Sequence, residues 1–171
     1  MGLLDILKQY SNPAATPTGD VFAHFDTVAQ QANPQDLGKG IAAALRSDAT
    51  PSFAQTIGGL FGQSSPSQKA GVLNEIVQAL GPGGLATAGG GILGRILGTG
   101  TGAPSTPITP AQAAQVSPAD LSTIAASVHQ QNGSIVDRLG SFYAQHPTLV
   151  KTLGVAALGA VMSHMSSQQR V

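Results

Sequence analysis

Along this 171-residue chain, a proline repeatedly follows serine, threonine or asparagine. The pairs are Asn33-Pro34, Thr50-Pro51, Ser65-Pro66, Thr109-Pro110 and Ser117-Pro118. At the start of an α-helix the polar side chain accepts a hydrogen bond from a free backbone N–H, and proline suits the first helical position because no N–H is needed there. Each pair therefore predicts the beginning of a helix. No stretch alternates apolar and polar residues for long enough to predict a strand.

The longest regular apolar pattern follows Ser65-Pro66. Its apolar side chains fall on the stripe of a core-facing helix, at Val72, Leu73, Ile76, Val77 and Leu80. Gly81-Pro82-Gly83 predicts its end, because glycine adopts the backbone conformation of a helix cap and proline blocks continuation. Full burial of such side chains contributes roughly 1.5–3 kcal/mol each, so we expect a core helix here.

Shorter apolar patterns predict further helices over 3–10, from Asp20 to Ala32, and after each of the other proline pairs, with a last helix from Pro147 to about Met165. The predicted fold is an all-α multihelical bundle of short, proline-capped helices in two units. The first unit covers 1–97, with a glycine-rich helix at its end. The second covers 110–171 and ends in an apolar helix. Glycine, threonine and proline at 98–109 predict a linker between them.

Glycines spaced by four, at Gly90, Gly94 and Gly98, would line one face of a helix, with Leu93 and Leu97 beside them. Such a face lets another backbone approach closely, within the fold, between subunits or at a membrane. Glycine also costs about 0.8–1.0 kcal/mol relative to alanine inside a helix, which favours a flexible linker instead. Both interpretations stay open. A phosphate-binding loop is disfavoured because its motif is missing.

The last predicted helix has a wide apolar face that includes Leu153, Ala157, Leu158 and Val161. With the glycine segment, it forms the predicted packing or assembly face. This helix is expected to be buried or to form an interface. Its strictly apolar part is about half of the ~20 residues that a bilayer span needs, so we predict no transmembrane helix. The first helix, Leu3 to Tyr10, either docks in the core or lies on a membrane or partner.

Charge is scarce: only 9% of residues are charged and the net charge is zero, whereas soluble domains have about 25% charged residues. Nucleic acid is not an expected partner, because binding phosphates requires a basic patch. An uncharged surface favours association with copies or with other proteins. The chain has no cysteine, which excludes disulfides. The N-terminal stretch does not match a secretory signal peptide, so we expect a cytoplasmic protein, with membrane association as an alternative.

No pattern of catalytic or metal-binding residues stands out. The histidines at 24, 129, 146 and 164 lack metal-ligand spacing, and no G-x-S-x-G nucleophile motif occurs. His24 follows Asp20 by four residues, which predicts a surface hydrogen bond or weak ion pair. We therefore expect no enzyme, no cofactor and no metal. A helical enzyme or ligand carrier would need His129, His146 and Asp137 to converge.

Two segments carry a family resemblance. Pro51–Gly83 has a phenylalanine-led helix, a Leu60–Gly62 turn, a serine-proline restart and the Ala70–Asn74 core pattern. It resembles the YidB-like family of small bacterial proteins, and Val116–Pro147 is similar to that family's second helical unit. The resemblance implies a helical, bacterial cytoplasmic protein. It implies no activity and no catalytic residue.

Together these features predict a non-enzymatic structural or interaction protein that self-associates through apolar, glycine- and alanine-rich helices. The expected partner is a second copy or another protein. A peripheral membrane protein that binds through its terminal helices is the alternative.

Overall fold

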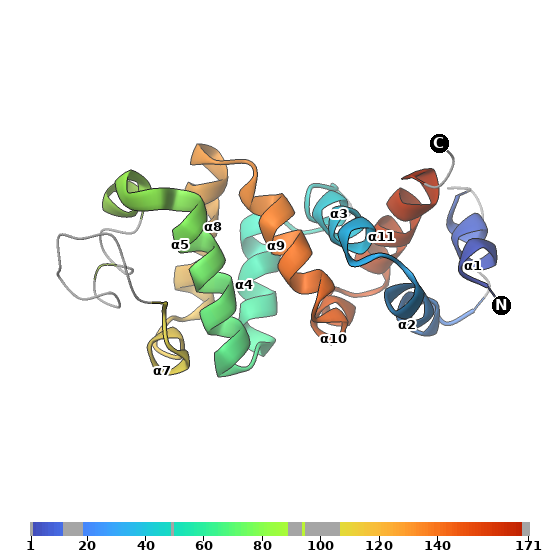
Figure 1. The fold of residues 1–171 in the computed structure, drawn as a ribbon, viewed down its shortest axis with the longest axis horizontal. Coiled ribbons are helices and arrows are strands. Elements are labelled where there is room, and N and C mark those ends of the chain that lie inside the picture. Colours follow the sequence, from blue (N-terminus) through green and yellow to red (C-terminus); the bar gives the residue numbers. More distant parts are fainter. Residues whose placement is uncertain (1, 12–18, 49, 89–93, 95–106, 169–171) are drawn as a thin grey trace. The chain divides into compact units, whose positions relative to one another are not determined.

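The computed structural model describes residues 2–11, 19–48, 50–88, 94 and 107–168 (Figure 1). Within these residues the regular structure is helical and contains no strand, which confirms the predicted all-α class. The chain forms two compact units, one from 1–52 with 139–171 and the other from 53–138. The boundary between them falls inside helix α9 (Ile135–Ala144).

These units differ from the two predicted from the sequence, 1–97 and 110–171, each of which was a single continuous stretch of chain. The two ends of the chain belong to one unit because its last helix packs on its first three. Apolar periodicity shows which face of a helix is buried, but not which helix covers that face. Most of the predicted linker, 98–106, lies outside the described residues, and 107–109 lead into a short helix.

Unit 1 is built around its C-terminal helix. Its elements are α1 (Leu3–Tyr10), α2 (Val21–Gln31), α3 (Pro34–Leu45), the end of α9, α10 (Pro147–Val150), the 3₁₀ turn η1 (Lys151–Leu153) and α11 (Val155–Gln168). Helix α11 packs on α3, α2 and α1. The buried side chains of α1 are Ile6, Leu7 and Tyr10, so this helix docks in the unit as one of the two alternatives predicted.

Glycines on α3 bring its backbone close to two other helices. A Cβ at Gly38 would lie 3.1 Å from Cα of Ser141 on α9, and one at Gly40 would lie 3.2 Å from the carbonyl oxygen of Val161 on α11. From the opposite side, a Cβ at Gly140 would lie 2.6 Å from the carbonyl oxygen of Gly38. Close-packing glycines therefore occur in this fold, at positions that the sequence analysis did not single out.

The prediction of one continuous helix from Pro147 to Met165 is wrong in one respect. In the structure this segment is interrupted at Gly154, where φ is +88°, and the α10–η1 segment meets α11 at a bend of 118°. Glycine allows this conformation because it has no Cβ to clash. The bend gives the short α10–η1 segment and α11 separate directions, and α11 then packs against α3.

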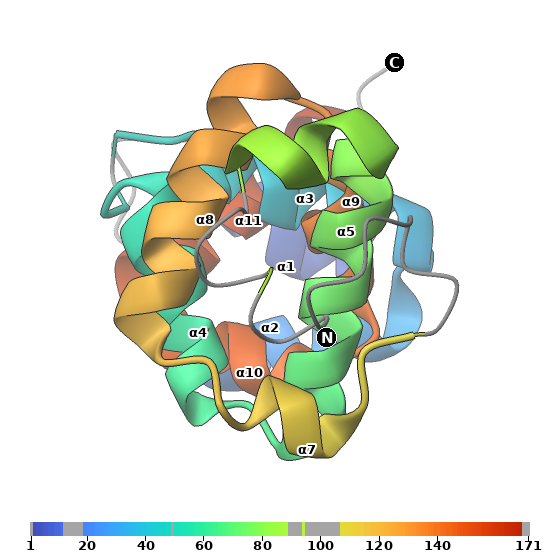
Figure 2. The same ribbon diagram turned by 90° about the vertical axis from the view of Figure 1, so that its left-hand side faces the viewer.

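Unit 2 contains α4 (Phe53–Gln63), α5 (Pro66–Ala88), α7 (Pro110–Ala113), α8 (Pro118–Gln131) and the start of α9. Helix α4 packs along α8, while α7 lies against α5 (Figure 2). The predicted end of the long helix is confirmed as a break, since Gly81 has φ of +62° and ψ of −178°. Helical structure resumes beyond it to Ala88, which the sequence did not predict.

Most proline pairs begin helices as predicted. Asn33 accepts a hydrogen bond from the N–H of Gln35, and Thr109 and Ser117 each form a reciprocal capping box. Thr50 is the exception. Helix α4 starts three residues later, and the Thr50 hydroxyl instead donates to the carbonyl oxygen of Ala44 at 2.8 Å, closing the end of α3.

Candidate interaction surface

The predicted glycine face is largely beyond what the structure describes. Gly90, Leu93, Leu97 and Gly98 lie outside the described residues. Gly94 is described as helical and half-buried. The choice between a close-packing face and a linker at this segment therefore stays a prediction.

The predicted apolar face of the C-terminal helix is buried within unit 1. Ala157, Leu158 and Val161 are at most 2% exposed, and Leu153 is half-buried in η1. Helix α11 packs along α3, where Val161 lies against Gly40. The face therefore serves packing inside the unit, and a surface for association has to be sought elsewhere.

His24 makes a contact that the sequence did not predict. Its ring is buried, and Nδ1 lies 3.1 Å from the Tyr10 hydroxyl, which joins α2 to α1. Burial, followed by the negative charge of Asp20, raises the pKa of the Tyr10 hydroxyl above its usual value. Asp20 accepts a hydrogen bond from the N–H of Phe22 at 2.9 Å as the helix cap, so the predicted surface pair with His24 is wrong. His24 pairs with Tyr10 because α1 packs against α2 in the folded unit.

Two other histidine rings lie against aromatic rings. His129 lies 5.0 Å from Phe53 in unit 2, measured between ring centroids, and His146 lies 4.9 Å from Phe142 in unit 1. No group of three or more histidine, aspartate or glutamate side chains that could hold a metal occurs in the described part of the chain. Each of these two histidine rings therefore packs against a phenylalanine ring of its own unit.

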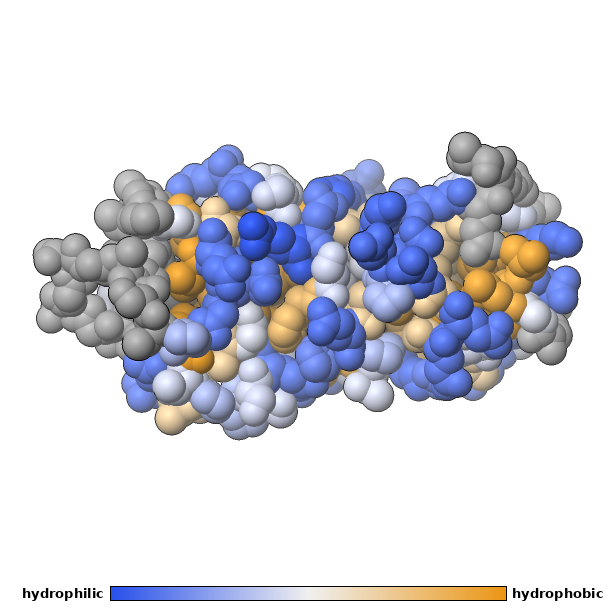
Figure 3. Space-filling view, viewed as in Figure 1, coloured by the Kyte–Doolittle hydropathy of each residue, from blue (hydrophilic) through white to orange (hydrophobic). Residues whose placement is uncertain are grey.

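The strongest candidates for an association surface are three apolar side chains that unit 1 leaves exposed. Among the described residues, the large hydrophobic side chains exposed to solvent are Leu4 at 60%, Phe22 at 37% and Val155 at 53%. We call them the first-turn residues, because each lies in the first turn of its helix, α1, α2 or α11. These three helices contact one another. Apolar surface over α1 is visible in Figure 3.

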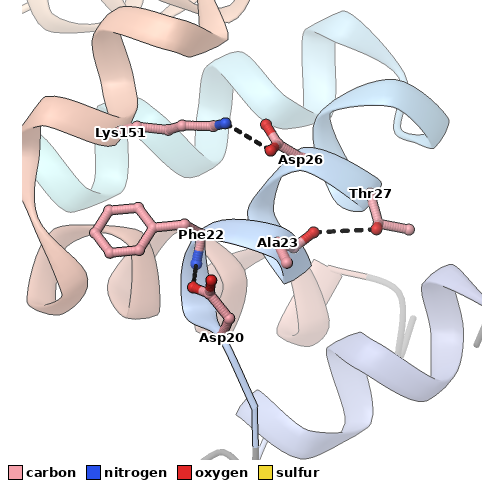
Figure 4. A network of polar contacts seen from close by, with 6 residues as sticks. All are labelled: Asp20, Phe22, Ala23, Asp26, Thr27 and Lys151. Atoms are coloured by element: carbon pink, nitrogen blue, oxygen red, sulfur yellow. Dashed lines mark hydrogen bonds and ion pairs between the residues drawn. The ribbon is translucent and has the colours of Figure 1, made fainter.

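Two acidic residues of unit 1 lie close to Phe22 along the chain, and both have partners within the unit. Asp26, one turn along α2, accepts a hydrogen bond from the Lys151 ammonium at 2.5 Å, while Asp20 caps the helix (Figure 4). The two partners of this ion pair are partly exposed, so its contribution to stability is modest. At the surface the pair offsets the charge of Asp26. The exposed part of Phe22 thus lies near one carboxylate paired with a cation and one that caps the helix.

Sequence reasoning missed two asparagines that hold unit 2 together. The Asn74 carboxamide binds both backbone groups of Ile108, accepting from N–H at 2.8 Å and donating to the carbonyl oxygen at 3.3 Å. Asn132 donates to the carbonyl oxygen of Ala79 at 3.0 Å. Each joins segments far apart in sequence. The only local signal was an amide side chain next to apolar neighbours.

Comparison with protein-family models, curated proteins and solved structures finds no match to this chain. In the described residues, no single helix has both the length and the apolar character to cross a bilayer. One bent pair, Pro147–Leu153 with Val155–Gln168, meets those criteria jointly by length and composition.

Proposed function

We propose that this chain is a non-enzymatic structural or interaction protein that self-associates through the first-turn residues of unit 1. One observation carries the proposal: Leu4, Phe22 and Val155 remain exposed on three helices that contact one another. The proposed association does not involve the apolar face of α11, which is buried within unit 1. Zero net charge supports a second copy as the partner, because two like copies then repel each other little.

The expected association is weak. Leu4, Phe22 and Val155 are 60%, 37% and 53% exposed. Burying these exposed parts contributes roughly 2–4.5 kcal/mol in total, at 1.5–3 kcal/mol for a full side chain. An affinity built on that energy alone lies in the millimolar range at best. The translational and rotational freedom lost on association weakens it further. Self-association is therefore expected to depend steeply on concentration.

Light scattering over a concentration series tests the proposal. The average mass of the wild-type chain should rise with concentration. Leu4→Gln, Phe22→Gln and Val155→Gln combined should shift that rise to higher concentration. The matched control combines Leu4→Met, Phe22→Leu and Val155→Ile, which keeps the surface apolar and should preserve association. A strictly monomeric wild type contradicts self-association, whereas association unchanged by the glutamine variant contradicts this surface.

A vesicle flotation assay distinguishes peripheral membrane binding, the alternative function, from self-association. Peripheral membrane binding predicts that the chain floats with liposomes and that the glutamine variant does not. If flotation depends on the first-turn residues while scattering shows a monomer at every concentration, the membrane alternative replaces self-association.

A further inference from the structure

The turn between α8 and α9 contains the sequence Asn132-Gly133. The other asparagines are Asn12 and Asn33, which precede proline, and Asn74, which precedes Glu75. A backbone nitrogen that follows asparagine can attack the side-chain amide, provided that it carries a proton to lose and is not crowded. Proline has no such proton, and glycine has no Cβ to obstruct the approach. Asn132 therefore has the most reactive neighbour of any asparagine in the chain.

The reaction needs only water and a base from the buffer. The Gly133 nitrogen gives its proton to the base and bonds to Cγ of Asn132. The bond from Cγ to Nδ2 breaks, and Nδ2 takes a proton from water and leaves as ammonia. The product is a five-membered succinimide. Water then adds to one of the two ring carbonyl carbons, and the bond from that carbon to the Gly133 nitrogen breaks, which yields either aspartate or isoaspartate. No electron is transferred to or from the chain.

The surroundings of Asn132 both favour and restrain this attack. Oδ1 accepts hydrogen bonds from the Ser134 N–H at 3.1 Å and the Ser134 hydroxyl at 2.6 Å. Donors at that oxygen stabilise the negative charge that develops during attack. Nδ2, the leaving group, is held by the carbonyl oxygen of Ala79 at 3.0 Å. Gly133 and Ser134 are exposed, so water reaches the turn.

The Ala79 contact lies near a weak point of α5, because Gly81 interrupts the helix two residues later. Deamidation replaces the Nδ2 donor with a carboxylate oxygen. Two acceptors would then face each other at the position of a former hydrogen bond, and a negative charge would lie against a carbonyl. The product cannot restore the link between the end of α5 and the turn after α8.

We propose that Asn132 is a site of spontaneous deamidation and that its modification permanently detaches the end of α5 from the α8–α9 turn. A transient opening of unit 2 then becomes irreversible. This inference is independent of the proposed self-association, since every residue in it belongs to unit 2.

The rate and position of the reaction test the first half. The full chain is incubated in mildly alkaline buffer, with and without denaturant, and followed by intact mass, peptide mapping and isoaspartate detection. Conversion should be confined to Asn132 and should run about ten-fold slower or more in the folded chain, because the Ala79 bond must open first. Gly133→Ala is the control: its added Cβ meets nothing within 4 Å, yet it crowds the attacking nitrogen. Equal conversion at Asn74, or an unchanged rate in Gly133→Ala, overturns the proposal.

Asn132→Asp tests the second half as a mimic of the product. It should unfold at a lower temperature than the wild type and show faster hydrogen exchange around Ala79. The aged wild-type chain provides the same readout if the variant does not fold. Stability and exchange equal to those of the unmodified chain in both samples would overturn the proposed detachment.

Discussion

The neighbouring glycines Gly58 and Gly59 on α4 offer a direct test of how the two main helices of unit 2 pack. Gly58 faces α8. A Cβ there would lie 2.8 Å from the carbonyl oxygen of Pro118 and would also meet the Ser122 hydroxyl. Real Cβ atoms essentially never come within 3.0 Å of such atoms, so the helices would have to separate. A Cβ at Gly59 meets nothing within 4 Å.

The expected energies follow from these distances. Replacing glycine by alanine inside a helix stabilises it by about 0.8–1.0 kcal/mol. Gly59→Ala should show this gain. Gly58→Ala should show the same gain offset by an overpacking cost of about 1–3 kcal/mol. The propensity terms cancel between the two variants, so the free energy of unfolding should be about 1–3 kcal/mol lower for Gly58→Ala than for Gly59→Ala.

Urea denaturation followed by circular dichroism measures this difference. Both positions lie in one helix of one unit, so the comparison does not depend on how unit 1 unfolds. Adding Ser122→Ala to Gly58→Ala should recover part of the loss, because one of the two obstructing groups is then removed. A Gly58→Ala variant as stable as Gly59→Ala would refute the close approach of α4 to α8.

Other contacts predict effects of similar size. Tyr143 is fully buried and its hydroxyl has no hydrogen-bond partner among the described residues, so Tyr143→Phe should raise the free energy of unfolding by about 1–3 kcal/mol in urea denaturation. Burial raises the pKa of Tyr143 above its usual 10.0, so stability should be lost as pH rises beyond that value, and less steeply in Tyr143→Phe. Asn74→Ala should cost about 1–3 kcal/mol and speed hydrogen exchange at the Ile108 amide, since both of its bonds are lost. A double-mutant cycle of Asp26→Ala and Lys151→Ala should give a coupling of only about 0.2–1 kcal/mol, because the pair is partly exposed; a coupling of several kcal/mol would contradict this.

The candidate surface was only partly accessible to sequence reasoning. The sequence left open whether the first helix docks in the core or lies on a membrane or partner. In the structure Ile6 and Leu7 of α1 are buried, while Leu4 is exposed. The predicted face on the last helix included Leu158 and Val161, which are buried. Hydrophobic periodicity identifies a face that avoids water, but it does not distinguish a face covered by the same chain from one that awaits a partner.

Local sequence patterns were enough to locate most helix starts and the break at Gly81. Asn33 and Ser117 cap helices and Gly81 breaks one because these effects depend on a side chain and the backbone within a few residues. Tertiary structure alone decided which helices meet. In the folded chain α11 packs against the first three helices, and His24 lies at hydrogen-bond distance from the Tyr10 hydroxyl. Gly58 lies where α4 and α8 approach closely. These outcomes join residues far apart in sequence, and no local pattern encodes the partner across such a distance.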